Sequence, residues 1–431
     1  MREMKDSGVE WISDIPVNWD IVPLKALFSF GKGLPITKEN LEESGIPVIS
    51  YGQIHVKWNS GVTTHRELMR FVNESYLETN PQSLVKRGDL IMADTSEDRE
   101  GCGNCAYVDT DETLFAGYHT IILRALSETD NKYLAYLFLT DPWRSQIRKA
   151  VSGVKLFSIS RRILGSVSAI VPDNADEIVA HLDEKCTQVN NLITNVHAQI
   201  EKLKAYKQSV IAEVVTKGLD PTVPMKDSGV VWIGDVPAHW KIKRGKALFK
   251  ETEARSTDGS EELLTVSQYT GITPRSQKNV TMFEALSLEG YKICEIGDIA
   301  ANTMWLWAGA IGVSEYRGVI SPSYNVYRQR GNHFIPQYLD YLLRAPMLVQ
   351  EYASLSTGIR ASRLRLYPKD FFNIMFPVPP IDEQQAILDV LSSQFSAVDR
   401  LIAIKQAKIE KLEQYKRSLI YEYVTGKKEV S

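Results

Sequence analysis

A pair of cysteines is the first place in this chain where residue type and spacing could do chemistry. Cys102-Gly-Asn-Cys105 has the spacing of half a zinc site, but no second Cys pair or His-x-His partner accompanies it. Gly101-x-Gly103-x-x-Ala106 overlaps the pair and mimics a dinucleotide-binding fingerprint. It follows an acidic run, residues 97–100, and no convincing helix start comes after it. We therefore predict a turn here, and neither a metal site nor a nucleotide site.

Two further motifs would belong to DNA-modifying or DNA-cleaving enzymes. Pro172-Asp173 followed by Asp183-Glu-Lys185 resembles a metal-nuclease pattern, in which two carboxylates hold Mg²⁺ and a lysine assists the attack. Its second half falls on the surface of a predicted long helix. Asp141-Pro-Trp143 is one proline short of the Asn/Asp-Pro-Pro-aromatic loop of adenine methyltransferases, and no cofactor glycine motif precedes it. We expect neither activity in this chain, and no catalytic or metal-binding residues.

Basic and aromatic residues at matched loop positions favour DNA binding instead. Lys and Arg neutralise phosphates, while Arg, Gln and Asn can contact base edges. Basic residues gather near the ends of two segments: Arg144, Arg148, Lys149, Lys155, Arg161 and Arg162 in the first, and Arg360, Arg363, Arg365 and Lys369 in the second. The leading candidates are Lys155 with Arg161 and Arg360 with Arg363. A solvated basic face that binds nothing is the alternative.

Aromatic residues beside polar ones extend the candidate set. Tyr118-His119 and Tyr324-Asn325 are predicted to occupy equivalent strand starts, and Trp305 lies in a loop after Asp298. Each ring could equally belong to a hydrophobic core. The full set of predicted DNA-binding residues is Lys32, Gln53, Lys57, Tyr118, His119, Lys155, Arg161, Arg162, Gln268, Tyr269, Trp305, Tyr324, Asn325, Arg360, Arg363 and Arg365.

Two long helices and two mixed segments must position these residues. Residues 178–216 contain no Pro or Gly and place apolar residues mostly three and four apart, which predicts an amphipathic helix with a heptad-like pattern. Residues 387–425 repeat the pattern, and each helix is expected to stop near a glycine, Gly218 or Gly426. At about 1.5 Å per residue each helix is longer than a compact domain needs, which indicates a spacer. Packing for stability alone is the alternative.

The segment before each helix combines short strands with a helical stretch. In the first, the β-branched runs 46–51, 89–93 and 119–123 predict strands, and 131–151 predicts a helix. The predicted fold class is therefore α/β, with two tandem modules and two long antiparallel helices that form a coiled coil. The predicted boundaries are residues 1–174 and 221–378 for the modules, and residues 175–220 and 379–431 for the helices.

An internal repeat relates the two halves. Residues 4–28 match residues 225–249 at 16 of 25 positions, and residues 199–216 match residues 408–425 at 11 of 18. The intervening segments agree only in scattered landmarks, among them Arg87-Gly-Asp-Leu-Ile against Ile296-Gly-Asp-Ile-Ala. A shared scaffold with different loops favours two related modules, pseudo-twofold related, that recognise different things.

Composition excludes several classes of protein. Of 431 residues, 44% are hydrophobic and 24% charged, which is typical of globular proteins and not of disordered or fibrous chains. Four cysteines make no disulfide framework, and neither a membrane-spanning run nor a signal peptide is evident. We therefore expect a cytoplasmic protein. The net charge of −3 argues against a basic coat for nucleic acid, so the prediction of DNA binding depends on the repeat.

The chain resembles a known family over nearly its whole length. Residues 7–19, Ser-Gly-Val-Glu-Trp-Ile-Ser-Asp-Ile-Pro-Val-Asn-Trp, and their repeat at 228–240 look like the opening of a target recognition domain in the specificity (S) subunit of type I restriction-modification enzymes. Residues 377–387, Pro-Val-Pro-Pro-Ile-Asp-Glu-Gln-Gln-Ala-Ile, are similar to the start of that family's long helix. Residues 171–178 depart from this pattern, because they hold one proline and no Glu-Gln pair.

The resemblance implies a non-catalytic subunit. Each target recognition domain would bind one half of an asymmetric, two-part double-stranded DNA site, and the helices would set the gap between the halves. Two modification (M) subunits would bind this subunit and supply adenine methylation with S-adenosylmethionine. Restriction (R) subunits would use ATP and Mg²⁺, so no cofactor is expected in this chain. M subunits would then share the phosphate contacts, which agrees with the near-neutral charge.

Two other classes of function stay open at this stage. A duplicated scaffold that binds two proteins would have no DNA specificity. A self-contained modification enzyme would need a methylase or nuclease region, for which the repeat leaves little room.

Overall fold

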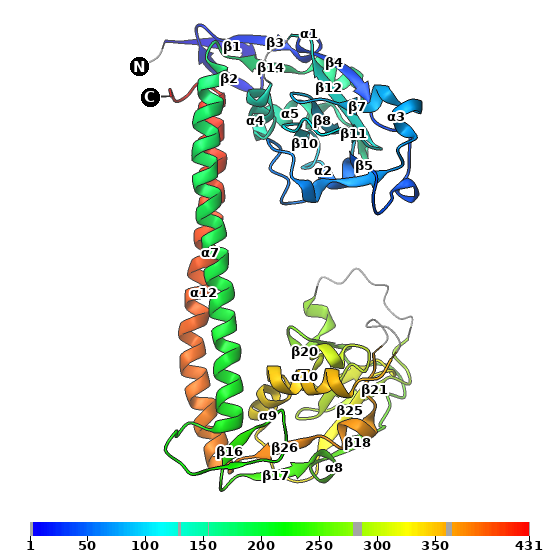
Figure 1. Cartoon of the computed structure of the whole chain (residues 1–431), viewed down its shortest axis with the longest axis vertical. Helices are drawn as coiled ribbons and strands as arrows, with labels where there is room; N and C mark the ends of the chain where they lie inside the picture. Colours follow the sequence, from blue (N-terminus) through cyan, green and yellow to red (C-terminus); the bar gives the residue numbers. More distant parts are fainter. Residues whose placement is uncertain (1–2, 128–130, 154, 279–286, 359–363, 431) are drawn as a thin grey trace. The chain divides into compact units, whose positions relative to one another are not determined.

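The computed structural model describes residues 3–127, 131–153, 155–278, 287–358 and 364–430. They form two compact units, one made of residues 1–195 and 407–431 and the other of residues 196–406. We call them unit 1 and unit 2. Each contains one α/β module and a part of both long helices, α7 (Ala175–Lys217) and α12 (Ile381–Val424) (Figure 1).

Unit 1 is built on two four-stranded sheets. Its central sheet has the order β10-β8-β12-β4 and is antiparallel throughout, and the second sheet has the order β6-β5-β11-β7. The strands are β1 (Met4–Val9), β2 (Ile12–Pro16), β3 (Asp20–Pro23), β4 (Phe28–Lys32), β5 (Ile46–Ile49), β6 (Arg70–Val72), β7 (Leu84–Val85), β8 (Leu90–Ala93), β9 (Thr95–Ser96), β10 (Cys105–Tyr107), β11 (Leu114–Ala116), β12 (Thr120–Ala125), β13 (Phe157–Ser158) and β14 (Ser168–Val171). The short helices are α1 (Leu24–Leu27), α2 (Tyr51–Ile54), α3 (Tyr76–Thr79), α4 (Lys132–Phe138), α5 (Asp141–Ala150) and α6 (Arg161–Ser166).

Unit 2 repeats the central sheet but not the second one. Its four-stranded sheet has the order β23-β22-β25-β18, the equivalent of β10-β8-β12-β4. The strands are β15 (Met225–Asp227), β16 (Asp235–Pro237), β17 (Lys241–Arg244), β18 (Phe249–Thr252), β19 (Leu264–Ser267), β20 (Gly271–Pro274), β21 (Lys292–Cys294), β22 (Ile299–Ala301), β23 (Ile311–Val313), β24 (Gly318–Ile320), β25 (Asn325–Gln329) and β26 (Met375–Val378). The short helices are α8 (Gly245–Leu248), α9 (Pro336–Leu343), α10 (Pro346–Leu355) and α11 (Pro368–Phe371).

The same buried ion pair holds the two central strands together in both units. Asp89 before β8 binds Arg124 of β12, with the carboxylate to Nη2 at 2.6 Å, and Asp298 before β22 binds Arg328 of β25, with Nε at 2.6 Å. The two carboxylates are only 1% and 2% exposed. This pair fixes which residues of the two modules are equivalent. Our prediction that Tyr118-His119 and Tyr324-Asn325 are equivalent is wrong, since the first pair lies two residues further from its arginine than the second does.

The predicted long helices are confirmed, and each begins slightly earlier than expected. Neither contains Pro or Gly, and Gly218 and Gly426 follow them with left-handed backbone (φ +73° and +70°). Within each unit the two helices run antiparallel. In unit 1, Lys416 of α12 donates to the Asn190 side chain of α7 at 2.9 Å, and in unit 2, Lys207 of α7 binds Asp399 of α12 at 2.8 Å.

The predicted helix over residues 131–151 is two helices, α4 and α5. Leu139 and Thr140 separate them, and α5 begins with Asp141-Pro142. Proline lacks an N–H and is tolerated in the first turn of a helix but not in its interior. The break turns the chain so that both helices pack on one core.

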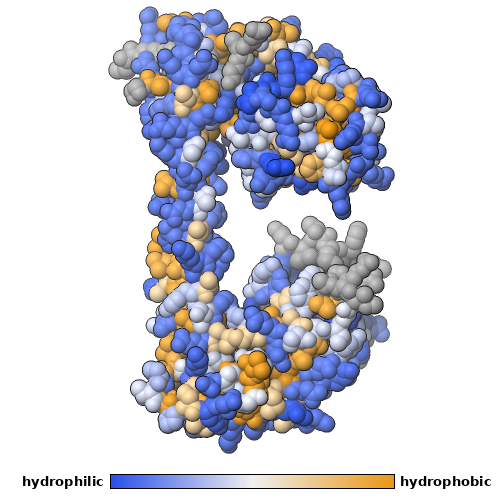
Figure 2. Space-filling model, viewed as in Figure 1, coloured by the Kyte–Doolittle hydropathy of each residue, from blue (hydrophilic) through white to orange (hydrophobic). Residues whose placement is uncertain are grey.

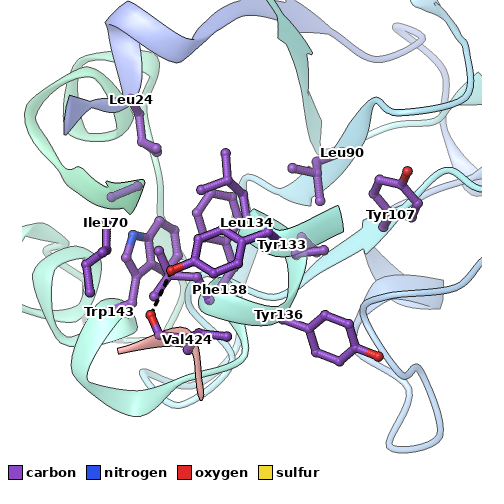
Figure 3. Packing of buried hydrophobic residues seen from close by; sticks show 14 of the residues in the cluster. Leu24, Leu90, Tyr107, Tyr133, Leu134, Tyr136, Phe138, Trp143, Ile170 and Val424 are labelled. Carbon is purple, nitrogen blue, oxygen red and sulfur yellow. Dashed lines mark hydrogen bonds between the residues drawn. The ribbon is translucent and has the colours of Figure 1, made fainter. Parts of the chain in front are cut away.

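That core joins the module of unit 1 to both long helices. Figure 3 shows part of it, with Val424 of α12 beside Tyr133. Trp143 stacks on Phe138 with ring centroids 3.8 Å apart, and Tyr133 donates its hydroxyl to the carbonyl oxygen of Val424, at the end of α12, at 2.8 Å. In unit 2, Tyr338 makes the equivalent bond to Val215, near the end of α7, at 3.2 Å. Each module therefore satisfies a carbonyl that the last turn of a long helix leaves unpaired.

Polar side chains cover most of the surface seen in Figure 2. Among the described residues, no helix is both long and apolar enough to cross a membrane.

Candidate nucleic-acid interface

In unit 1, aromatic and polar side chains gather where the central sheet ends. Tyr51 of α2 makes edge contacts with Tyr118 and His119, with ring centroids 5.6 and 5.3 Å apart. His119 Nδ1 lies 3.3 Å from Asp94 Oδ1 and 3.4 Å from the Thr95 hydroxyl. We call Tyr51, Asp94, Thr95, Tyr118 and His119 the unit 1 cluster.

His119 has an unusual backbone conformation and an exposed side chain. Its φ of +55° is in the left-handed region, which costs a non-glycine residue roughly 1–2 kcal/mol, and its side chain is 57% exposed. Such strain is retained where the surroundings hold it and often marks a functional position. Burial raises the pKa of Tyr118, so its phenol stays neutral and able to donate a hydrogen bond.

Other predicted residues of unit 1 lie beside this cluster or away from it. Lys32 ends β4 and pairs with Ile121, next to the turn that carries His119. Lys155 is exposed and precedes β13, which pairs with β9 at Thr95 and Ser96. Arg161 and Arg162 are exposed at the start of α6, and no contact places them in the cluster.

The remaining two predicted residues of unit 1 are Gln53 in α2 and Lys57 just after it. Gln53 accepts the Ser50 N–H at 3.1 Å, so part of its amide is used in holding α2. Lys57 is exposed and lines the cleft, of about 1570 Å³, which lies between the module and the helix pair.

Several basic residues of unit 1 are held by the protein itself. Arg144 donates to the Phe138 carbonyl at 2.7 Å, and burial lowers the pKa of its guanidinium. Arg148 binds Glu100 and Asp141, and Lys149 binds Glu10. They are weaker candidates for phosphate contacts than Lys32 and Lys155.

Unit 2 carries different side chains at the equivalent sheet end. Counted from the buried ion pairs, Asp94 and His119 of unit 1 correspond to Thr303 and Ser323, whose hydroxyl and carbonyl oxygen are 2.7 Å apart. Asn302 donates to the Tyr324 hydroxyl at 2.8 Å, and Trp305 stacks on Trp307 with centroids 5.6 Å apart. Burial raises the pKa of Tyr324. Trp305 is 49% exposed.

The other predicted residues of unit 2 differ widely in exposure. Tyr269 is 81% exposed at the tip of the β19–β20 hairpin, beside the half-buried Gln268. Asn325 is 7% exposed as the first residue of β25, which leaves its side chain little room to contact DNA. Arg365 is half-buried, and its backbone pairs with Thr357. Arg360 and Arg363 lie outside the described residues.

The enzyme-like motifs are structural in the described parts of the chain. Asp183 accepts hydrogen bonds from Lys132 at 2.6 Å and from the Tyr136 hydroxyl at 2.7 Å, so α4 holds it against α7. Trp143 is fully buried and donates to the Ser168 carbonyl. Cys102 and Cys105 are buried, and burial raises the pKa of Cys105 to about 11. No cluster of three or more His, Cys, Asp or Glu that could hold a metal ion occurs among the described residues.

Comparison with known proteins identifies the family of this chain. A family model, the type I restriction modification DNA specificity domain, matches the chain twice, at residues 16–207 and 225–414. The chain belongs to this family. The resemblance noted from the sequence is therefore confirmed, and the chain is a type I restriction-modification specificity protein with two tandem DNA specificity domains.

Two curated relatives come from Methanocaldococcus jannaschii. The putative type I restriction enzyme MjaX specificity subunit is 22% identical over 96% of this chain and 95% of its own length. The type I restriction enzyme MjaVIII specificity subunit is 23% identical over 81% of each chain. Among solved structures, a chain from a study of complex assembly and conformational transition of the type I R-M system has a TM-score of 0.65 at 16% identity, over 96% of this chain and 99% of that one. This last likeness concerns the fold.

Proposed function

We propose that each module binds one half of an asymmetric, two-part DNA site, and that the long helices set the unread gap between the halves. The observation that carries this proposal is the pair of equivalent sheet ends. The Asp–Arg ion pair and the strand order of the central sheet repeat in both units, while Asp94 and His119 in unit 1 are replaced by Thr303 and Ser323 in unit 2. One scaffold with two different sets of contact residues is what recognition of two different sequences requires.

The chemistry of each cluster fits contact with base edges. A carboxylate such as Asp94 can accept from cytosine N4, and His119 and Tyr118 can donate to acceptors in the major groove. Lys32 and Lys155 would neutralise phosphates and fix the register. In unit 2, Tyr269 and Trp305 supply exposed aromatic surface, and Gln268 precedes Tyr269 in the hairpin. The basic residues Arg360, Arg363 and Arg365 remain predicted contacts of the second half-site.

Catalysis is assigned to partner subunits. We propose that two M subunits bind the helices and methylate adenine with S-adenosylmethionine, and that R subunits use ATP and Mg²⁺ for restriction. The chain would act in the cytoplasm, where the DNA is. None of the comparisons supports the alternative of a duplicated protein-binding scaffold without DNA specificity.

Methylation mapping tests the proposal. DNA from cells that express this chain with its M subunit should carry N6-methyladenine in a two-part motif with a fixed gap, absent when only this chain is missing. His119→Ala should relax the sequence of one half, and Trp305→Ala that of the other. Arg87→Ala is the matched control, because this exposed cation binds Asp111 beside the opposite end of β8. A complex that assembles but methylates no two-part motif would overturn the proposal.

The helices can be tested separately. Inserting one helical turn into both α7 and α12 should lengthen the gap and leave both half-sites unchanged. An unchanged gap would show that the helices do not set the spacing.

A further inference from the structure

A polar pair at the sheet end of unit 2 has no counterpart at the equivalent positions of unit 1. Asn302 directly follows β22 and is 5% exposed, and its amide donates to the hydroxyl of the half-buried Tyr324, just before β25, at 2.8 Å. Counted from the buried ion pairs, the equivalent residues of unit 1 are Ala93 and Thr120. The Thr120 hydroxyl is buried and donates to the carbonyl oxygen of Gly117 at 2.7 Å. The two sheet ends therefore differ in their hydrogen-bonding groups as well as in shape.

The backbone fixes which way the Asn302 amide faces. Its Oδ1 accepts the backbone N–H of Met304 at 3.1 Å. A backbone N–H can only donate, so a reversed amide would bring two N–H groups together. The Nδ2 group must therefore face Tyr324, and an amide nitrogen is also a donor only. It follows that the Tyr324 oxygen is the acceptor in this bond.

The hydrogen of the Tyr324 hydroxyl is left for another partner. A phenol has one hydrogen to donate, and the bond with Asn302 does not use it. None of the residues that the structure describes accepts this hydrogen. Burial raises the pKa of the Tyr324 phenol, so the hydrogen stays on the oxygen at neutral pH. Tyr324 is therefore a hydrogen-bond donor towards any group that contacts its hydroxyl.

The turn before β25 holds Tyr324 in place. Its backbone N–H donates to the Ser321 carbonyl oxygen at 3.0 Å, and the Thr303 hydroxyl donates to the Ser323 carbonyl oxygen at 2.7 Å. The ring packs against a small core of unit 2 that includes Val326. A donor held in one direction loses little freedom on binding, and a base that cannot accept its hydrogen leaves it unpaired.

We propose that Tyr324 is a specificity-determining residue whose hydrogen-bond direction is set by Asn302, so that the base it contacts must present an acceptor. The inference rests on the proposed function, in which unit 2 binds one half of the DNA site. In the major groove, guanine, adenine and thymine each present an acceptor, at O6, N7 or O4, whereas cytosine presents the N4 amino group. Tyr324 therefore rejects cytosine at one position of this half-site. Asn302 is a positioning residue, because it acts through Tyr324.

The substitution Asn302→Asp reverses the direction of the bond. A carboxylate has nearly the shape of the amide and still accepts the Met304 N–H, but it accepts the hydrogen of the Tyr324 hydroxyl as well. Only the lone pairs of the Tyr324 oxygen then remain for DNA. The contacted position should now favour a base with an amino group, cytosine or adenine, over guanine or thymine by roughly tenfold in binding.

Methylation mapping of the full complex with its M subunit identifies the contacted position. Tyr324→Phe removes only the hydroxyl, so one position of one half-site should lose its preference and accept all four bases. In the wild-type motif that position should hold guanine, adenine or thymine. In Asn302→Asp the same position should accept cytosine, and the other half-site should stay unchanged. Fluorescence anisotropy with duplexes that differ only at this position then measures the change in affinity.

The double variant Asn302→Asp, Tyr324→Phe is the matched control. It keeps the new carboxylate and lacks the hydroxyl, so it should accept all four bases, as Tyr324→Phe does. A preference for cytosine in the double variant would mean that the carboxylate itself contacts the base, and it would overturn the inference. Because a buried carboxylate can lower stability, Tyr324→Phe also decides the matter without it.

The outcomes separate the two proposals. Unchanged base preferences in Tyr324→Phe, or cytosine at the position that Tyr324→Phe relaxes, would overturn the inference. So would an assembled Asn302→Asp complex with the wild-type motif. In each of these cases the two-part motif of the wild-type complex leaves the proposed function intact. A wild-type complex that assembles without making a two-part motif would overturn the proposed function, and the inference with it.

Discussion

Replacing Asp89 by alanine should destabilise the central sheet of unit 1 by about 3 kcal/mol. The carboxylate is almost fully buried and accepts from Arg124 Nη2 at 2.6 Å and from the Lys86 backbone N–H at 2.9 Å. A hydrogen bond to a charged group contributes about 1.5–3 kcal/mol, and a buried N–H without an acceptor costs about 1–3 kcal/mol. Arg124 is 37% exposed, so water solvates it after the substitution and the loss stays below the ~5 kcal/mol of a fully buried pair.

Hydrogen exchange followed by mass spectrometry measures this loss where it occurs. Peptides from β8 and β12 should exchange through an opening whose free energy falls by the stated amount. A double-mutant cycle with Arg124→Met should give a coupling of about 1–2 kcal/mol, because the two side chains stabilise each other. Asp298→Ala should have the same effect on β22 and β25, where the geometry repeats.

The control is Asp111→Ala, which removes an exposed partner of Arg87 and should leave exchange unchanged. The reasoning would be refuted if Asp89→Ala had no larger effect than this control, or if Asp89 and Arg124 behaved additively. Either result would mean that the repeated pair does not hold the strands, and the equivalence of the two sheet ends would lose its physical basis.

Three further predictions concern single side chains. Tyr133→Phe and Tyr338→Phe should each lower the free energy of unfolding by about 1–2 kcal/mol, because a buried carbonyl at a helix end loses its hydrogen-bond donor. Hydrogen exchange should become faster in the last turn of α12 and of α7 respectively. Tyr206→Phe, on an exposed ring, is the control, and equal exchange in all three variants would contradict the prediction. His119→Gly should relieve the strain of the left-handed backbone and keep or raise stability, while one DNA half-site loses specificity. His119→Ala should lower both stability and specificity. Full half-site specificity in both variants would show that His119 does not contact DNA. Burial raises the pKa of Cys105 to about 11, above its value in the unfolded chain. The contribution of the neutral thiol to folding stability is therefore complete below about pH 9, and up to about 3 kcal/mol of stability is lost as the pH rises toward 11. Alkylation of Cys105 in the native protein at pH 9 as fast as in urea would show that the thiol is not buried.

The repeat and the long helices could be predicted because both are local patterns. Apolar residues three and four apart over a stretch without Pro or Gly leave few alternatives to a helix, and identity between residues 4–28 and 225–249 needs no structure to detect. The hydrogen bonds at the helix ends could not be predicted. The bond between Tyr133 and Val424 joins residues 291 apart in the sequence, and no sequence pattern indicates it.

The sequence predicts only two of the five residues of the unit 1 cluster, for a physical reason. Tyr118 and His119 were found because aromatic and polar residues stand together, but Tyr51, Asp94 and Thr95 reach them from other elements. The strand starts were matched by their aromatic residues, although the segment between the ion-paired Asp and Arg is five residues shorter in unit 2. Long-range register of this kind depends on pairing between strands, which a single sequence does not reveal.

The composition of unit 1 from two distant stretches of chain has a consequence for the order of folding. Unit 2 is continuous, residues 196–406, and can complete its core as soon as those residues have left the ribosome. Unit 1 cannot, because Trp19 and Tyr133 pack against residues that are made only after all of unit 2, including Val424 and Gly426. During synthesis, the first module to be translated is therefore the last to complete its core. Its apolar end stays exposed until the C-terminal part of α12 packs on it.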